Sequence, residues 1–286
     1  MASADHTTPM GKRRRSSGRT AYGSDVAAPP SPASLIRNAL CLRLNLEAKQ
    51  IAIDKLANSM RIYAEASIRF PGLKLVDMEE AVNNLDRAFE SKLEAFHSLY
   101  DITRSEFEYF GHADTALLIV LRNAVHHRDH LLFKSWNHKM LLKSGFTKYS
   151  GAAFLLANFE VGGGVYTGQY YYKLDDVLDR LDSSRGSPYL ASQMRPPKRD
   201  RLMRTISEGL NFDKIFSFAS SERYPTGQIY LNLIPVFISG MVRVFSHLKS
   251  TGMVFKGYDS DVYRDYFTSG LNVNFDEIAF KRVRLP

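Results

Sequence analysis

The sequence contains a single cysteine, Cys41, among its 286 residues. One cysteine cannot form a disulfide within the chain, so the protein does not belong to the small secreted domains that disulfides hold together. We therefore expect a reducing compartment and predict a cytoplasmic location.

Long apolar runs are also lacking. A membrane-spanning helix needs about 18 or more consecutive apolar residues, and the nearest candidate, residues 229–245, is interrupted by Asn232, Pro235 and Arg243. We expect a buried helix there and no membrane partner. The N-terminus has no apolar segment after its basic residues, so it does not resemble a secretory signal.

Several catalytic signatures are missing. There is no G-x-S-x-G nucleophile motif, and Gly162-Gly163-Gly164 lacks the GK[ST] ending of a phosphate-binding loop. Acidic residues are outnumbered, with 30 Asp and Glu against 38 Lys and Arg, which gives a formal net charge of +8. This excess favours a polyanionic partner, with nucleic acid as the first candidate.

The chain divides by composition into four segments. Residues 1–33 are rich in Ser, Gly, Ala and Pro and contain Lys12-Arg13-Arg14-Arg15, so we predict a disordered basic tail. Residues 34–143 show helical apolar periodicity and predict a helical bundle. Residues 144–200 predict a β-hairpin and a basic loop, and residues 201–286 a C-terminal helical part that packs on the bundle.

Three helices are expected in the bundle. Ser34 can cap the first, which we predict to end near residue 67 because Phe70-Pro71-Gly72 follows. Asp77 is expected to start the second, and Asp114 to cap the third.

The β-hairpin is predicted from two strand-like runs, residues 151–161 and 165–172, on either side of Gly162-Gly163-Gly164. A short helix is expected at residues 174–181, and the alternation at residues 271–275 indicates a strand. The predicted fold class is therefore mainly α, a helical bundle with a small β-hairpin insertion and a mixed C-terminal part.

The strongest functional pattern is Arg122-Asn123-Ala124-Val125-His126-His127. Arginine can stabilise charge on a phosphate, and histidine can transfer a proton to or from a ribose hydroxyl, so RNA could be cleaved without a metal. Asn123 and His127 share a helix face, where the amide could orient the ring. Arg122 and His127 lie roughly 140° apart on a regular helix, which splays them. Two copies of the chain that meet across a two-fold axis could bring both pairs into one cleft.

These residues resemble the R-N-x-x-x-H signature of the HEPN superfamily, whose all-helical members include metal-independent ribonuclease toxins and CRISPR-associated RNA nucleases. The resemblance covers the motif and its helical context. It implies an endoribonuclease without cofactor or metal that acts as a homodimer, with Arg122 and His127 as catalytic residues and Asn123 as the polar position between them. It also implies a toxin or an anti-phage defence effector with an antitoxin or activating protein. Many family members are inactive binding or dimerisation modules, so a non-catalytic nucleic-acid or protein binding module is the alternative.

Other interpretations of the motif stay open. His126 lies one helical turn from Arg122 and could be the functional histidine instead of His127. His126 and His130 have the spacing of paired zinc ligands, but no glutamate lies between them. The whole histidine cluster could also be incidental in a helical scaffold. The residues expected to contact the RNA backbone are Arg128, Arg195, Lys198, Arg199 and Arg201.

Overall fold

The computed structural model describes residues 32–126, 132–163, 168–257 and 260–286. The chain divides into two compact units, Met1–Leu42 and Arg43–Pro286. In the first unit only the beginning of helix α1 (Pro32–Val76) is described, and the predicted basic tail lies almost entirely outside the described residues. The architecture below is that of the second unit.

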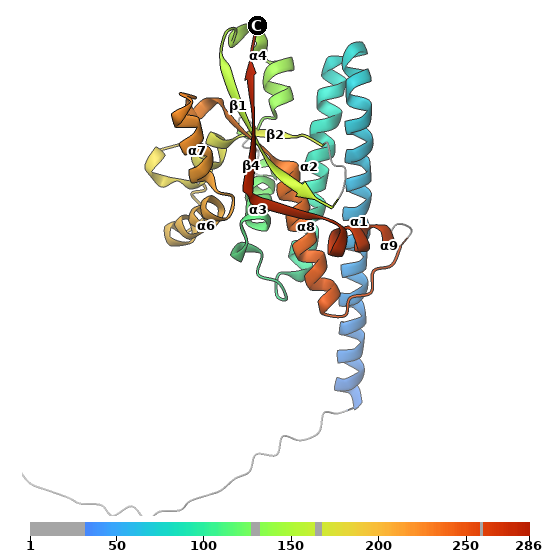
Figure 1. The fold of residues 1–286 in the computed structure, drawn as a ribbon. Coiled ribbons are helices and arrows are strands. Elements are labelled where there is room, and N and C mark those ends of the chain that lie inside the picture. The colour runs from blue at the N-terminus through green and yellow to red at the C-terminus, as the bar shows by residue number, and fades with distance from the viewer. Residues whose placement is uncertain (1–31, 127–131, 164–167, 258–259) are drawn as a thin grey trace, which may run out of the picture. The chain divides into compact units, whose positions relative to one another are not determined.

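The first two helices show one confirmed prediction and one error (Figure 1). Helix α2 (Met78–Thr103) begins where expected, because the Asp77 carboxylate accepts a hydrogen bond of 2.8 Å from the backbone N–H of Glu80. The predicted break at Pro71 is wrong, since α1 continues through it to Val76. Proline removes only one backbone hydrogen bond, and Pro71 is exposed, so water can bind the carbonyl that lost its donor.

Helix α3 (Ala113–His126) occupies the centre of the unit. Its apolar run packs against α2, α6 (Pro196–Gly209) and α8 (Leu233–Ser250), which explains why almost every residue from 114 to 121 is buried. Asp114 does not cap this helix as predicted. The helix begins one residue earlier, and the Asp114 carboxylate points inward, where it accepts hydrogen bonds from Ser239 and Arg243.

A four-stranded mixed sheet accompanies the helices, with strand order β2-β3-β1-β4. Its strands are β1 (Ala153–Gly162), β2 (Tyr171–Lys173), β3 (Ile229–Asn232) and β4 (Asn272–Arg284). Strand β1 pairs in parallel with β3 and antiparallel with β4, while β2 pairs antiparallel with β3.

The predicted β-hairpin is therefore wrong, because β3 lies between its two expected strands. The glycines promote a local turn, but the apolar run of β1 is buried on both faces, as in a central strand that pairs with distant segments. Strand β3 also shortens the buried helix expected at residues 229–245, whose first residues join the sheet. As a result, the segments 144–200 and 201–286 share one sheet.

Both faces of the sheet are covered. Leu155 and Phe159 belong to the main core beneath α8, whereas Phe154 and Leu156 join a smaller cluster with Met140 on the opposite face. Tyr170, Tyr171 and Tyr172 are all buried. None of the three can therefore stack on an RNA base without a rearrangement of the core.

The remaining elements are short. They are η1 (Tyr109–Gly111), η2 (His138–Leu142), α4 (Gly145–Lys148), α5 (Leu174–Leu181), η3 (Ser183–Arg185), α7 (Phe212–Ser221), η4 (Thr226–Gln228), α9 (Ser260–Asp265) and η5 (Tyr266–Gly270). The fold is thus mainly helical with a small sheet, as predicted in outline.

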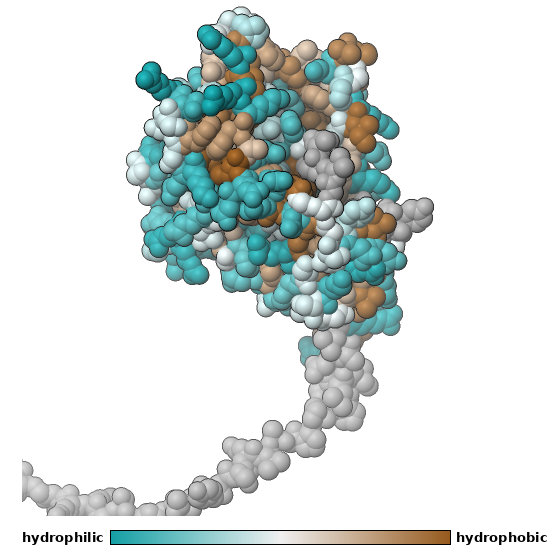
Figure 2. Space-filling model, viewed as in Figure 1, coloured by the Kyte–Doolittle hydropathy of each residue, from teal (hydrophilic) through white to brown (hydrophobic). Residues whose placement is uncertain are grey.

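Among the described residues, no helix combines the length and the apolar character that crossing a membrane requires. The face shown in Figure 2 is largely hydrophilic, and the apolar residues visible on it form small separate groups.

Candidate functional site

Helix α3 positions the predicted motif. Its buried apolar run fixes the helix in the core, and its last described turn carries Arg122, Asn123 and His126 out to the side of α2. The described part of the helix ends at His126. His127, the predicted catalytic histidine, and Arg128 lie outside the described residues, as does His130 of the zinc alternative.

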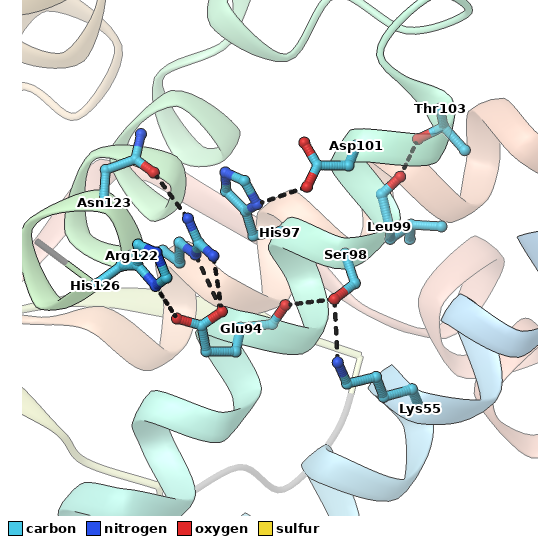
Figure 3. A network of polar contacts seen from close by, with 10 residues as sticks. All are labelled: Lys55, Glu94, His97, Ser98, Leu99, Asp101, Thr103, Arg122, Asn123 and His126. Carbon is cyan, nitrogen blue, oxygen red and sulfur yellow. Dashed lines mark hydrogen bonds and ion pairs between the residues drawn. The ribbon is translucent and has the colours of Figure 1, made fainter.

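Glu94 of α2 holds the Arg122 guanidinium (Figure 3). Arg122 donates from Nε and Nη2 to Glu94 Oε2, at 3.1 and 3.0 Å. The arginine side chain is only 16% exposed and the glutamate 40%, so the carboxylate keeps contact with solvent. This geometry gives Arg122 a fixed orientation at the surface of the helical core.

The second carboxylate oxygen of Glu94 faces a histidine. Its Oε1 lies 3.7 Å from Nδ1 of His126, a distance that is long for a hydrogen bond but close enough for an ion pair when the ring is protonated. The His126 side chain is more than half exposed. A cation, a carboxylate and an imidazole therefore meet in one group, which we call the Glu94 triad (Glu94, Arg122 and His126).

Asn123 connects this triad to a neighbouring cleft. Its Oδ1 accepts a hydrogen bond of 3.3 Å from Arg122 Nη1, and Figure 3 shows the amide nitrogen turned away from the arginine. The predicted contact between Asn123 and His127 involves a residue outside the described ones. Within the described residues, the amide instead holds Arg122 and lines the cleft.

A second histidine lies close to the triad on α2. Nδ1 of His97 is 3.2 Å from Asp101 Oδ2, and its side chain is only 12% exposed. Burial lowers the pKa of His97, and the nearby positive charge of Arg122 lowers it further, against the opposite effect of Asp101 and Glu94. Neither Glu94 nor His97 is predicted from the sequence, because their spacing from the motif carries no local pattern.

The cleft beside Asn123 has a volume of about 700 Å³. It lies between the end of α3, the loop of residues 188–194 and the start of α6, and we call it the basic cleft. Its charged, amide and aromatic lining residues include Phe110, Asn123, Arg180, Tyr189, Arg195 and Lys198. Among the described residues that line it, three are cationic and none is Asp or Glu. The cleft therefore attracts an anion.

The predicted RNA-contacting cations separate into three kinds. Arg195 and Lys198 line the basic cleft, whereas Arg201 is exposed on the same helix but does not line it. Arg199 is only 5% exposed and donates to the carbonyls of the loop before α6. The expectation that Arg199 binds RNA from the surface is therefore wrong, because its side chain turns into the protein to hold that loop.

The triad contains the groups that metal-free phosphodiester cleavage needs. A carboxylate can accept a proton from a 2′-hydroxyl, an imidazolium can donate one to a leaving oxygen, and a guanidinium can stabilise the charge that develops on phosphate. Among the described residues, no cluster of three or more His, Cys, Asp or Glu side chains could hold a metal ion. Sequence reasoning supplied Arg122 and His126 for this group, and the fold supplied Glu94.

No protein-family model, curated protein or solved structure matches this chain. The chemistry of the site therefore rests on the geometry of its own residues.

Proposed function

We propose that this protein is a metal-independent endoribonuclease of the HEPN type. The observation that carries the proposal is the Glu94 triad at the edge of a cleft lined by cations and without a lining carboxylate. The cleft would hold the RNA backbone, and the triad would act on the phosphodiester beside Asn123. A cytoplasmic location and a role as a toxin or defence effector with an antitoxin or activator belong to the same proposal.

The reaction assigns one task to each side chain. Glu94 takes the proton of the ribose 2′-hydroxyl, and the 2′-oxygen forms a bond to the adjacent phosphorus. The bond from phosphorus to the 5′-oxygen breaks, and protonated His126 donates its proton to that oxygen. Arg122 stabilises the charge on the non-bridging oxygens. The products are a 2′,3′-cyclic phosphate and a 5′-hydroxyl, and solvent restores both protonation states.

His127 is the residue that the HEPN resemblance assigns to the proton transfer. In the described part of the chain, His126 is the histidine that faces Glu94, so we assign the transfer to His126. A homodimer would bring His127 of each chain to the composite site that the resemblance implies.

A second candidate function is RNA binding without cleavage. It is favoured by the ion pair itself, because Glu94 engages Nε and Nη2 of Arg122 and offsets the positive charge that a phosphate would need. In that case the basic cleft would bind RNA, and the triad would only stabilise the end of α3.

The test is cleavage of a mixed pool of tRNA and single-stranded RNA in the presence of EDTA. We expect the wild type to cleave and Arg122→Ala and His126→Ala to lose at least about 100-fold in rate, the usual effect of removing a proton donor or an oxyanion stabiliser. Arg87→Ala, an exposed arginine on α2, is the matched control and should cleave normally.

Each outcome separates the candidates. Loss of cleavage with His127→Ala but not with His126→Ala would show that His127 transfers the proton. Binding without cleavage by any variant would support the binding module. Equal cleavage by wild type and Arg122→Ala would rule out the proposed site.

A further inference from the structure

The basic cleft has a buried cation behind it that lacks an acidic partner. Arg199 is only 5% exposed, and its Nη1 makes two long contacts, at 3.4 Å to the Ala191 carbonyl and 3.5 Å to the Met194 carbonyl. Its Nε has no hydrogen-bond partner among the described residues. Buried guanidinium groups are normally compensated by a carboxylate or another anion. Here no described carboxylate forms an ion pair with Arg199.

Three more cations line the cleft, Arg180 on α5, Arg195 directly before α6 and Lys198 on α6. Arg180 donates to the Tyr189 carbonyl at 3.1 Å, so it holds the loop of residues 188–194. Lys198 Nζ lies 4.8 Å from the centre of the Phe110 ring, which fixes the ammonium at the cleft wall. Arg195 is exposed at the start of α6. No Asp or Glu lines the cleft among the described residues.

The rest of the lining fits a base rather than a bare anion. Tyr189 and the apolar side chains of Val120 and Met194 provide a wall against which a flat ring can pack. Asn123 and Gln193 supply amides, the groups that read the edges of unpaired bases. The volume of about 700 Å³ is within the range of small-ligand sites.

We propose that the basic cleft is a nucleotide subsite. Its cations hold a phosphate group, and its aromatic, apolar and amide lining holds the attached base in an unpaired state. The inference rests on the proposed function, because it takes single-stranded RNA as the source of the nucleotide. The cleft would hold that nucleotide next to the phosphodiester that faces the Glu94 triad.

The first test measures binding of AMP, adenosine and inorganic phosphate to the full chain by calorimetry. We expect AMP to bind at least about tenfold more tightly than either part, because base and phosphate contacts add. Lys198→Ala and Arg195→Ala should each weaken AMP binding by about tenfold, the usual loss for one charge-assisted contact. Arg201→Ala is the matched control from the same helix and should bind AMP like the wild type.

A second arm identifies the source of the nucleotide. A 5′-phosphorylated RNA trinucleotide that binds at least about tenfold more tightly than AMP would support an RNA strand, and equal affinity would support a free nucleotide. No measurable AMP or trinucleotide binding, or equal binding by Lys198→Ala and wild type, would overturn the subsite. Arg122→Ala should lose cleavage and keep AMP binding, so failure of the subsite and failure of the ribonuclease proposal give different results.

Discussion

Helix α3 carries an arginine–carboxylate pair at each end, and the two pairs differ in their surroundings. Near its start, Asp114 is completely buried and receives Arg243 Nε at 3.2 and 3.1 Å and Ser239 Oγ at 2.6 Å. Near its end, Arg122 pairs with Glu94, whose side chain is 40% exposed and also faces His126.

The two carboxylates differ in how far the protein satisfies them. The Asp114 carboxylate is satisfied entirely by the protein, so its contribution is to hold α3 against α8. The Glu94 carboxylate remains in contact with water and with a titratable ring, so it can exchange a proton. A carboxylate that the protein satisfies entirely has a structural role, whereas the more exposed Glu94 carboxylate is the one to which we assign the proposed chemistry.

Replacing the arginine of each pair by methionine is the strongest test of this comparison. We expect Arg243→Met to lower the free energy of unfolding by about 3 kcal/mol, since it leaves a buried carboxylate without its cation. Arg122→Met should cost less than about 1 kcal/mol, because Glu94 can be hydrated. Urea unfolding followed by circular dichroism measures both. Equal losses would show that exposure does not separate the two pairs.

For RNA cleavage we expect the opposite order, with a larger effect from changing Glu94 than from changing the Asp114–Arg243 pair. Glu94→Gln keeps the shape of the side chain but removes its ability to accept a proton, so we expect RNA cleavage to fall about 100-fold with little change in stability. Ser239→Cys, which perturbs the buried pair, is the control and should leave cleavage per folded molecule unchanged. A Glu94→Gln variant with full activity would reduce Glu94 to a residue that only positions Arg122.

Lys92 is a third case, a buried lysine that forms no ion pair with a described carboxylate. Its Nζ lies 3.8, 4.2 and 4.9 Å from the ring centres of Tyr63, Phe237 and Phe89. Burial lowers the pKa of Lys92 well below its ordinary value. The native state therefore holds the neutral amine at pH values where the unfolded chain carries the ammonium.

The pH dependence follows from this difference. Between the lowered native pKa and the unfolded value of about 10.4, the unfolded state binds the extra proton, so this site makes the protein less stable as pH falls. We expect Lys92→Met to raise the free energy of unfolding by more than about 1 kcal/mol at pH 7, and the gain to shrink as pH approaches 10. A variant that is less stable at both pH values would show that the aromatic rings hold the charged form.

The smallest effects concern single hydroxyl groups at the two pairs. Ser239→Ala removes one hydrogen bond to the buried Asp114 carboxylate and should cost about 1 kcal/mol. Ser98→Ala, on the α2 turn that follows Glu94, removes a part-buried bond to the Glu94 carbonyl and should cost less than about 0.5 kcal/mol. Thermal unfolding of both variants measures the two losses. A larger loss for Ser98→Ala than for Ser239→Ala would contradict the structural role of the Asp114–Arg243 pair.

Sequence patterns predicted those features that depend on neighbours in the chain. Asp77 and the amphipathic face of α2 mark a helix start and its buried side, and both signals are local. The Glu94 contact joins residues 28 positions apart, and no periodicity connects them. The position of α3 in the core, and not the motif, determines which acid meets Arg122.

The errors have the same origin. The glycines at 162–164 predict a turn, but hydrogen bonding with β3 and β4 overrides a direct pairing of the flanking runs. Arg199 lies in a sequence segment with the composition of a solvated basic loop. At the start of α6, however, its side chain turns inward. Local chemistry identifies a turn or a charge, whereas tertiary packing decides its partner.

The order of the strands has a consequence for how the chain is made. Strand β1 is synthesised well before its neighbours, since Leu155 pairs with Ile229 on one side and Arg282 on the other. In a nascent chain both edges of β1 therefore stay open until β3 is made, 74 residues after Leu155 at Ile229. The second edge stays open until β4 is made, 127 residues after Leu155 at Arg282. Pairing over such separations slows folding, and the unpaired edges of β1 favour aggregation during this interval.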